Sequence, residues 1–225
     1  MRTRIKICGI TRELDLLAAV NAGADAVGFV FHPSSQRFVS AERASELVER
    51  LPAFVNSVAL FVNPDVQFVR SVIDQMHPTL LQFHGDESPE FCASFGWPYL
   101  KAFRVGAPGI DTPEGLARAC QGFHGARGWL FDSYTPAYGG SGHGFDHQLL
   151  SEILAMDASQ RAALILSGGL SAENLDIALR NVRPWAVDVS SGVEDAPGIK
   201  SANKIEAFIS AVKKADDSGA LTADS

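Results

Sequence analysis

The chain has 225 residues, of which 46% are hydrophobic and 20% are charged, and its formal net charge is −7. These values are typical of a globular protein with a sizeable core. With this negative net charge, no basic face for nucleic acid stands out. No apolar run approaches the roughly 18–20 residues that span a bilayer. The three cysteines, Cys8, Cys92 and Cys120, are an odd number and lack metal-ligand spacing. We therefore expect no disulfide framework and no metal site, and we expect a cytoplasmic location.

Eight short apolar segments follow one another along the chain and predict β-strands. They cover residues 4–8, 25–31, 57–62, 79–83, 99–103, 128–132, 163–167 and 185–190. Between them, apolar residues recur with a helical period. Ser88-Pro89 and Thr112-Pro113 each place a hydroxyl cap before a proline, which predicts two helix starts. Thr11 and Ser171 predict two more, since each is followed by an acidic residue near the positive end of the helix.

The regular alternation predicts an α/β protein of the (β/α)8 TIM barrel class. Units of roughly 25–30 residues match the count and length of such a barrel. A doubly wound open sheet is the main competitor, but it seldom needs eight regular units. We expect a single catalytic domain over residues 1–214, followed by a disordered tail over residues 215–225, which are small and polar.

Unusual residues fall at the carboxyl ends of the predicted strands, where barrel enzymes place their active sites. Cys8 ends the first strand, Asp132 ends the sixth and Asp188 lies late in the last. Side chains alternate across a strand, so the apolar neighbours of these residues face outward and the thiol and carboxylates face into the barrel. Lys6 shares the inward face with Cys8.

Loops rich in glycine and serine follow the last three strands and predict a phosphate site. Glycine lets backbone N–H groups approach an anion, and phosphate sites after strands 7 and 8 recur in this fold. The predicted phosphate-binding residues are Gly140, Gly142, Ser167, Gly168, Gly169, Ser190, Ser191 and Gly192. The loop that contains Gly140 and Gly142 suits a lid over a ligand, and the alternative is a plain connection.

Several separated motifs stand in a characteristic order along the chain. They are "KICGIT", "GADAVGFVFHPSSQR", "LQFHGDES", "LFDSY" with "GGSGHGFD", "LSGGLSAENL" and "AVDVSSGVE". Together they resemble the phosphoribosylanthranilate isomerase family of tryptophan biosynthesis over nearly the whole chain. The resemblance implies an enzyme that performs an Amadori rearrangement. It converts N-(5-phosphoribosyl)anthranilate to 1-(2-carboxyphenylamino)-1-deoxyribulose 5-phosphate, with no redox change and no cofactor.

The resemblance also implies roles for individual residues. Asp132 protonates the furanose ring oxygen, and Cys8 as a thiolate removes the proton from C2′. Arg37 binds the anthranilate carboxylate, which suits its planar fork. Asp188 orients the anthranilate amine or holds Lys6.

Some alternatives stay open on the sequence alone. Lys6 either stabilises the Cys8 thiolate or forms a structural ion pair with Asp188, and His84, with Gln82, either lines the pocket or caps a turn. The rival functions are another phosphosugar isomerase, a pentose-phosphate epimerase and a non-catalytic sensor of phosphoribosyl ligands. The expected partner is a small phosphoribosyl molecule, not nucleic acid or membrane, and the chain is expected to be a monomer or a homodimer.

Overall fold

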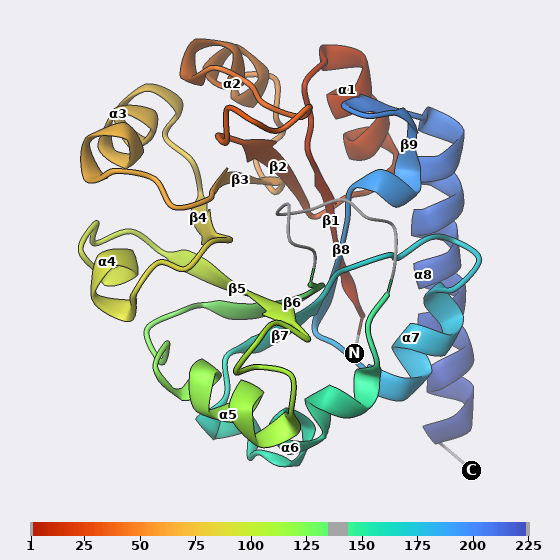
Figure 1. Cartoon of the computed structure of the whole chain (residues 1–225). Helices are drawn as coiled ribbons and strands as arrows, with labels where there is room; N and C mark the ends of the chain where they lie inside the picture. Colours follow the sequence, from red (N-terminus) through yellow and green to blue (C-terminus); the bar gives the residue numbers. More distant parts are fainter. Residues whose placement is uncertain (1, 135–143, 224–225) are drawn as a thin grey trace.

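Eight parallel strands form a closed barrel in the computed structural model, which describes residues 2–134 and 144–223 (Figure 1). The strands are β1 (Arg4–Cys8), β2 (Ala26–Val30), β3 (Asn56–Phe61), β4 (Leu80–Phe83), β5 (Tyr99–Val105), β6 (Gly128–Ser133), β7 (Ala163–Leu166) and β8 (Ala186–Val189). Each strand pairs with the next, and β1 also pairs with β8, which closes the barrel. The predicted TIM barrel is therefore confirmed, and the open doubly wound sheet is excluded.

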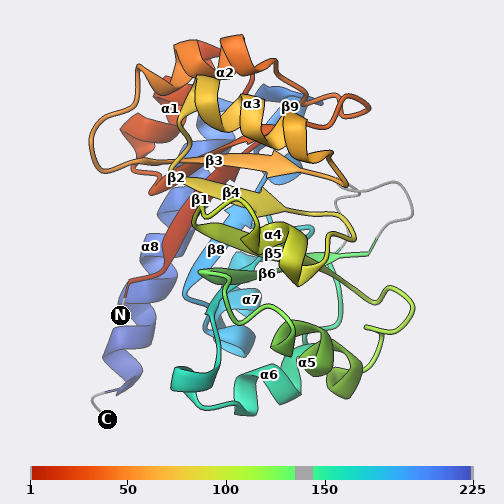
Figure 2. The same ribbon diagram turned by 90° about the vertical axis from the view of Figure 1, so that its left-hand side faces the viewer.

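Helices surround the barrel on its outside (Figures 1 and 2). They are α1 (Glu13–Ala22), α2 (Ala41–Val48), α3 (Val66–Met76), α4 (Pro89–Ala93), α5 (Pro113–Gln121), α6 (Ser151–Ala155), α7 (Leu175–Val182) and α8 (Ala202–Ala223). A small hairpin of β9 (Glu194–Ala196) and β10 (Ile199–Lys200) lies between β8 and α8 and was not predicted. In the described part of the chain, no helix is both long enough and apolar enough to cross a membrane.

Two of the four predicted helix caps are confirmed. Ser88 Oγ accepts a hydrogen bond from Phe91 N at 3.2 Å, and Thr112 Oγ1 accepts one from Gly115 N at 3.1 Å. The starts at Thr11 and Ser171 are wrong. Thr11 Oγ1 instead donates to the carbonyl of Gly198, so α1 begins at Glu13, and a turn delays the start of α7 to Leu175.

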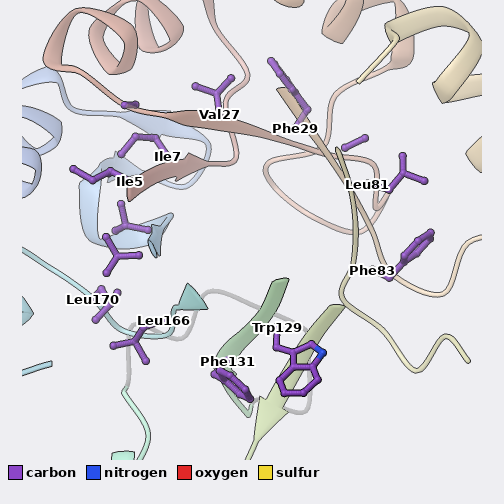
Figure 3. Packing of buried hydrophobic residues seen from close by; sticks show 14 of the residues in the cluster. Ile5, Ile7, Val27, Phe29, Leu81, Phe83, Trp129, Phe131, Leu166 and Leu170 are labelled. Atoms are coloured by element: carbon purple, nitrogen blue, oxygen red, sulfur yellow. The ribbon is translucent and has the colours of Figure 1, made fainter. Parts of the chain in front are cut away.

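The side chains of the strands divide into two layers, as the alternation predicts. The outward-facing residues, including Ile5, Ile7, Trp129 and Phe131, pack against the helices in one large cluster, and their labelled side chains ring the barrel in Figure 3. The residues between them form a smaller inner cluster, which consists of Val58, Leu100, Ala102, Leu130, Ile165 and Ala186. This alternation turns the polar residues at the strand ends into the barrel.

The last helix extends beyond Lys214, the predicted end of the domain. Asp216 accepts hydrogen bonds from the backbone N–H and the hydroxyl of Thr3, both at 2.7 Å, and so ties α8 to the segment before β1. Both ends of the described chain accordingly lie at the same end of the barrel (Figure 2). This helix runs through Ala223 and so includes most of the residues that the sequence assigned to a tail.

Candidate active site

A pocket lies at the carboxyl ends of β6, β7 and β8. Its lining consists of Asp132, Ser133, Ser167, Gly168, Gly169, Leu170, Asp188, Val189, Ser190, Ser191 and Gly192. Six of the eight predicted phosphate-binding residues therefore surround one space, together with both predicted carboxylates. Gly140, Gly142 and most of the predicted lid fall outside the described residues.

Glycine is required where the loops of this pocket approach one another. Gly168 has a φ of +84°, and a Cβ there would lie 2.6 Å from Ser133 N and 2.9 Å from Asp132 Oδ1. A Cβ on Gly192 would collide with the carbonyl oxygen of Leu170. These close approaches explain the glycines sterically, and the binding of phosphate by the loops stays a prediction.

Lys6 and Asp188 form a buried ion pair inside the barrel. Lys6 Nζ lies 2.9 Å from each carboxylate oxygen of Asp188, and the side chains are only 6% and 5% exposed. Burial opposes the charge of Lys6, but the carboxylate of Asp188 and the neighbouring Cys8 outweigh it and raise the pKa of the ammonium group. The structural ion pair that the sequence left as one alternative is therefore present.

Cys8 ends β1 beside this pair and is 5% exposed. Burial raises the pKa of its thiol above the ordinary value and the charge of Asp188 adds to the rise, while the ammonium of Lys6 acts in the opposite direction. Gly28 on β2 makes room for both side chains, because a Cβ there would lie 2.8 Å from Cys8 Sγ and 3.1 Å from Lys6 Nζ. The sequence interpretation missed Gly28, although a glycine inside an apolar strand is itself a sign of close approach.

Asp132 has two hydrogen-bonding neighbours at the end of β6. The backbone N–H of Ser133 lies 2.9 Å from Oδ1, and His84 Nε2 lies 3.1 Å from Oδ2. The other ring nitrogen of His84, Nδ1, lies 3.1 Å from Nε2 of Gln82. Both ring nitrogens of His84 therefore have polar neighbours, Gln82 on one side and the predicted acid Asp132 on the other. Neither His84 nor Gln82 is among the residues that line the pocket, so a role of His84 in substrate binding stays a prediction.

Arg37 makes a bidentate ion pair with Glu194, through Nε at 2.8 Å and Nη2 at 2.7 Å. Glu194 also accepts from Lys200 Nζ at 2.8 Å, and Lys200 donates to the carbonyl of Ser190 at 3.0 Å. Burial would raise the pKa of Glu194, but Arg37 and Lys200 outweigh it and lower the pKa. Glu194 is the last residue of the motif "AVDVSSGVE", but the sequence predicted no role for it. No sequence pattern pointed to Lys200 as a site residue.

The residues that the structure describes contain no group of three or more histidine, cysteine, aspartate or glutamate side chains that could hold a metal ion. Cys92 and Cys120, predicted as structural, are fully buried in helices α4 and α5.

Residues 5–211 match the model of N-(5′-phosphoribosyl)anthranilate (PRA) isomerase. The chain belongs to this family. A PRA isomerase of Bordetella pertussis is 59% identical over 216 residues, which cover 96% of this chain and 98% of the relative. The enzyme of Dechloromonas aromatica is 52% identical and covers 97% of this chain and all of its own.

Solved structures of PRA isomerases have the same fold. The enzyme of Thermotoga maritima superposes with a TM-score of 0.84 at 40% identity, over 94% of this chain and 99% of its own. A PRA isomerase in complex with reduced 1-(o-carboxyphenylamino)-1-deoxyribulose 5-phosphate gives a TM-score of 0.80 at 36% identity, with the same coverage. Residues 5–211, which match the family model, include β6, β7 and β8, the strands that border the pocket.

Proposed function

We propose that Asp132 and Cys8 are the acid and the base with which this PRA isomerase converts N-(5′-phosphoribosyl)anthranilate to 1-(2-carboxyphenylamino)-1-deoxyribulose 5-phosphate. The proposal rests on one observation. The Cys8 thiol ends β1 and the Asp132 carboxyl group lies one residue before the end of β6, both on the inner face of one barrel. Glycine- and serine-rich loops line the pocket that contains Asp132. An aldose–ketose rearrangement needs one acid and one base, each worth about 10²–10⁴-fold in rate.

The protons balance in two steps. Asp132, as a carboxylic acid, gives its proton to the furanose ring oxygen while the bond from that oxygen to C1′ breaks, which leaves a protonated Schiff base. Cys8, as a thiolate, then takes the proton from C2′, and the electron pair of that C–H bond forms an enolamine. The enolamine tautomerises to the ketone, so the substrate gains and loses no electrons overall.

The ammonium of Lys6 favours the Cys8 thiolate, while burial and the charge of Asp188 act against it and leave the pKa of the thiol raised. Since burial raises the pKa of Cys8, the thiolate needs a nearby cation, and the ammonium of Lys6 is the group that lowers it most. Both oxygens of Asp188 are held by Lys6, so we assign to Asp188 the fixing of Lys6 and not proton transfer. Lys6 then combines the two roles that the sequence left open.

The remaining polar groups suit the two ends of the substrate. The pocket loops containing Ser167, Gly169, Ser190 and Gly192 would take the phosphate. Arg37 donates hydrogen bonds to Glu194 through Nε and Nη2, and its Nη1 has no hydrogen bond within residues 2–134 and 144–223. Nη1 would therefore bind the anthranilate carboxylate. A planar fork held on one edge presents its other edge in a defined direction.

We further propose that the chain works as a single catalytic domain in the cytoplasm, with this phosphoribosyl compound as its small-molecule partner and without a cofactor. It would do so as a monomer or a homodimer. Light scattering of the purified protein distinguishes these two states. A solved relative from Thermotoga maritima is a dimeric PRA isomerase of which monomers have been generated.

Enzyme activity separates the proposal from a ligand sensor on the same barrel. The substrate is generated from anthranilate and the phosphoribosyl donor, and its fluorescence is followed after the protein is added. Wild type should consume the substrate, and Asp132→Asn should do so about 10²–10⁴-fold more slowly. Binding without consumption by wild type would favour the sensor, and an undiminished rate in Asp132→Asn would exclude this acid.

A further inference from the structure

Gln82 is a polar side chain buried inside the barrel. It is fully shielded from solvent on β4, and its register neighbours on either side are Leu60 and Leu100. Its Nε2 faces His84 Nδ1 at 3.1 Å, but its Oε1 has no hydrogen-bond partner among the described residues. Buried amide oxygens are nearly always bonded, so this one needs an explanation.

The orientation of this amide determines which nitrogen of His84 carries the hydrogen. Because an amide NH2 group only donates, the facing Nδ1 must accept, and the hydrogen of the neutral ring is then on Nε2. That hydrogen points at Asp132 Oδ2, 3.1 Å away, an arrangement that suits a carboxylate. Ser133 N holds the other oxygen, Oδ1.

A half-turn of the amide reverses every donor and acceptor along this line. Oε1 would then face Nδ1, which must carry the hydrogen, and Nε2 would offer a lone pair to Asp132 Oδ2. Only a protonated Asp132 can donate to that lone pair. Since Oε1 has no partner in its present position, no other hydrogen bond in the described residues resists the rotation.

We propose that Gln82 is a positioning residue for the acid: its amide selects the ring nitrogen of His84 that carries hydrogen, and thereby holds Asp132 either as a carboxylate or as a carboxylic acid. The inference rests on the acid role proposed above for Asp132. His84 is neutral in both arrangements, and Asp132 carries one more proton in the second than in the first. This proton is the one that Asp132 gives to the ring oxygen of the substrate, and solvent then replaces it. His84 reaches across β5 to make this connection, because β5 lies between β4 and β6 (Figure 1).

Two substitutions of Gln82 separate its donor and acceptor functions. Gln82→Glu keeps the shape, but a carboxylate only accepts, so it fixes the hydrogen of His84 on Nδ1. Gln82→Met removes both functions at similar size. Leu100→Met is the matched control, because it places the same side chain in the same inner layer beside Gln82. The readout is ¹⁵N NMR of histidine-labelled protein, in which ring shifts report the protonated nitrogen and His84→Asn identifies the signals of His84 among six histidines.

We expect hydrogen on Nε2 in wild type and in Leu100→Met above neutral pH, and on Nδ1 in Gln82→Glu. In Gln82→Met, kcat should fall about tenfold, the equivalent of one hydrogen bond, while KM changes less than about twofold because Gln82 acts through His84 and not on the substrate. The proposal is overturned if His84 carries its hydrogen on Nε2 in wild type and Gln82→Glu alike. Should Gln82→Glu not fold, an unchanged His84 spectrum in Gln82→Met overturns it equally.

The same set of variants separates this inference from the proposed function. A wild-type rate in Asp132→Asn contradicts the acid role, whatever His84 does. A slow Asp132→Asn together with a His84 spectrum that is independent of Gln82 contradicts only the positioning role.

Discussion

Lys6 Nζ lies 2.9 Å from both carboxylate oxygens of Asp188, and the pair is buried beside Cys8. Removal of one member of such a pair leaves an uncompensated buried charge, which usually costs about 3–5 kcal/mol. Lys6→Met should therefore lower the free energy of unfolding by about that amount, measured by denaturant titration. Arg180→Met, which removes one partner of an exposed pair with Asp176, should change it by less than about 1 kcal/mol.

Lys6→Met also tests the state of the base. Lys6 opposes the rise in the pKa of Cys8 that burial causes, so its removal should raise that pKa further. Ultraviolet absorbance of the thiolate against pH measures the change, with Cys8→Ala as the blank. An identical titration in Lys6→Met and wild type would mean that Lys6 has only a structural role.

Gly28→Ala should impair catalysis although the substitution is small. The new Cβ would lie 2.8 Å from Cys8 Sγ, so the thiol must move. A displacement of about 1 Å near the reacting atoms can cost about 10²-fold, and we expect a loss of that order in kcat. Gly122→Ala is the control, because its nearest contacts are 3.5 Å away, and it should keep the wild-type kcat.

Arg37 should affect binding more than turnover, because its proposed contact is with the anthranilate carboxylate. Arg37→Lys loses the fork that Glu194 holds by two bonds, and we expect KM to rise about 10–100-fold, the value of one charge-assisted hydrogen bond. Glu194→Gln should raise KM by a smaller factor, since Arg37 stays charged but is held less firmly. Steady-state kinetics with varied substrate gives both numbers, and a fall in kcat at constant KM would contradict the assignment.

The buried cysteines should make the fold sensitive to alkali. Burial raises the pKa of Cys92 from 9.0 to about 12 and raises that of Cys120 further. Between pH 9 and 12 the folded chain therefore binds more protons than the unfolded chain, and stability must fall as pH rises. Each such group contributes about 1.36 kcal/mol per pH unit. Denaturant titrations across this range should show a shallower decline in Cys92→Ala, and equal slopes in the variant and in wild type would show that the Cys92 thiol does not cause the decline.

The barrel, and the inward direction of the polar residues at its strand ends, were predictable for a local reason. Lys6, Cys8, Asp132 and Asp188 lie at or near strand ends, where the two-residue alternation alone decides which way a side chain points. The glycines at the pocket were also recognisable, because they follow the strands directly. Local patterns sufficed for these features.

Contacts between distant segments were not predictable in this way. The ion pair of Arg37 and Glu194 joins the loop after β2 to the β9–β10 hairpin, and the bond of His84 to Asp132 passes over β5. The contact between Thr3 and Asp216, which holds α8 against the segment before β1, joins residues 213 positions apart. None of these pairings leaves a periodic or compositional trace in the sequence.

The central claim is that the thiol at the end of β1 removes the proton from the substrate, and one kinetic comparison tests it most directly. Wild type and Cys8→Ala are supplied with N-(5′-phosphoribosyl)anthranilate formed in situ, and the loss of its fluorescence is followed for both, after equal thermal stability has been established. We predict rapid loss with wild type and a rate about 10²–10⁴-fold lower with Cys8→Ala. A wild-type rate in Cys8→Ala would show that another group is the base.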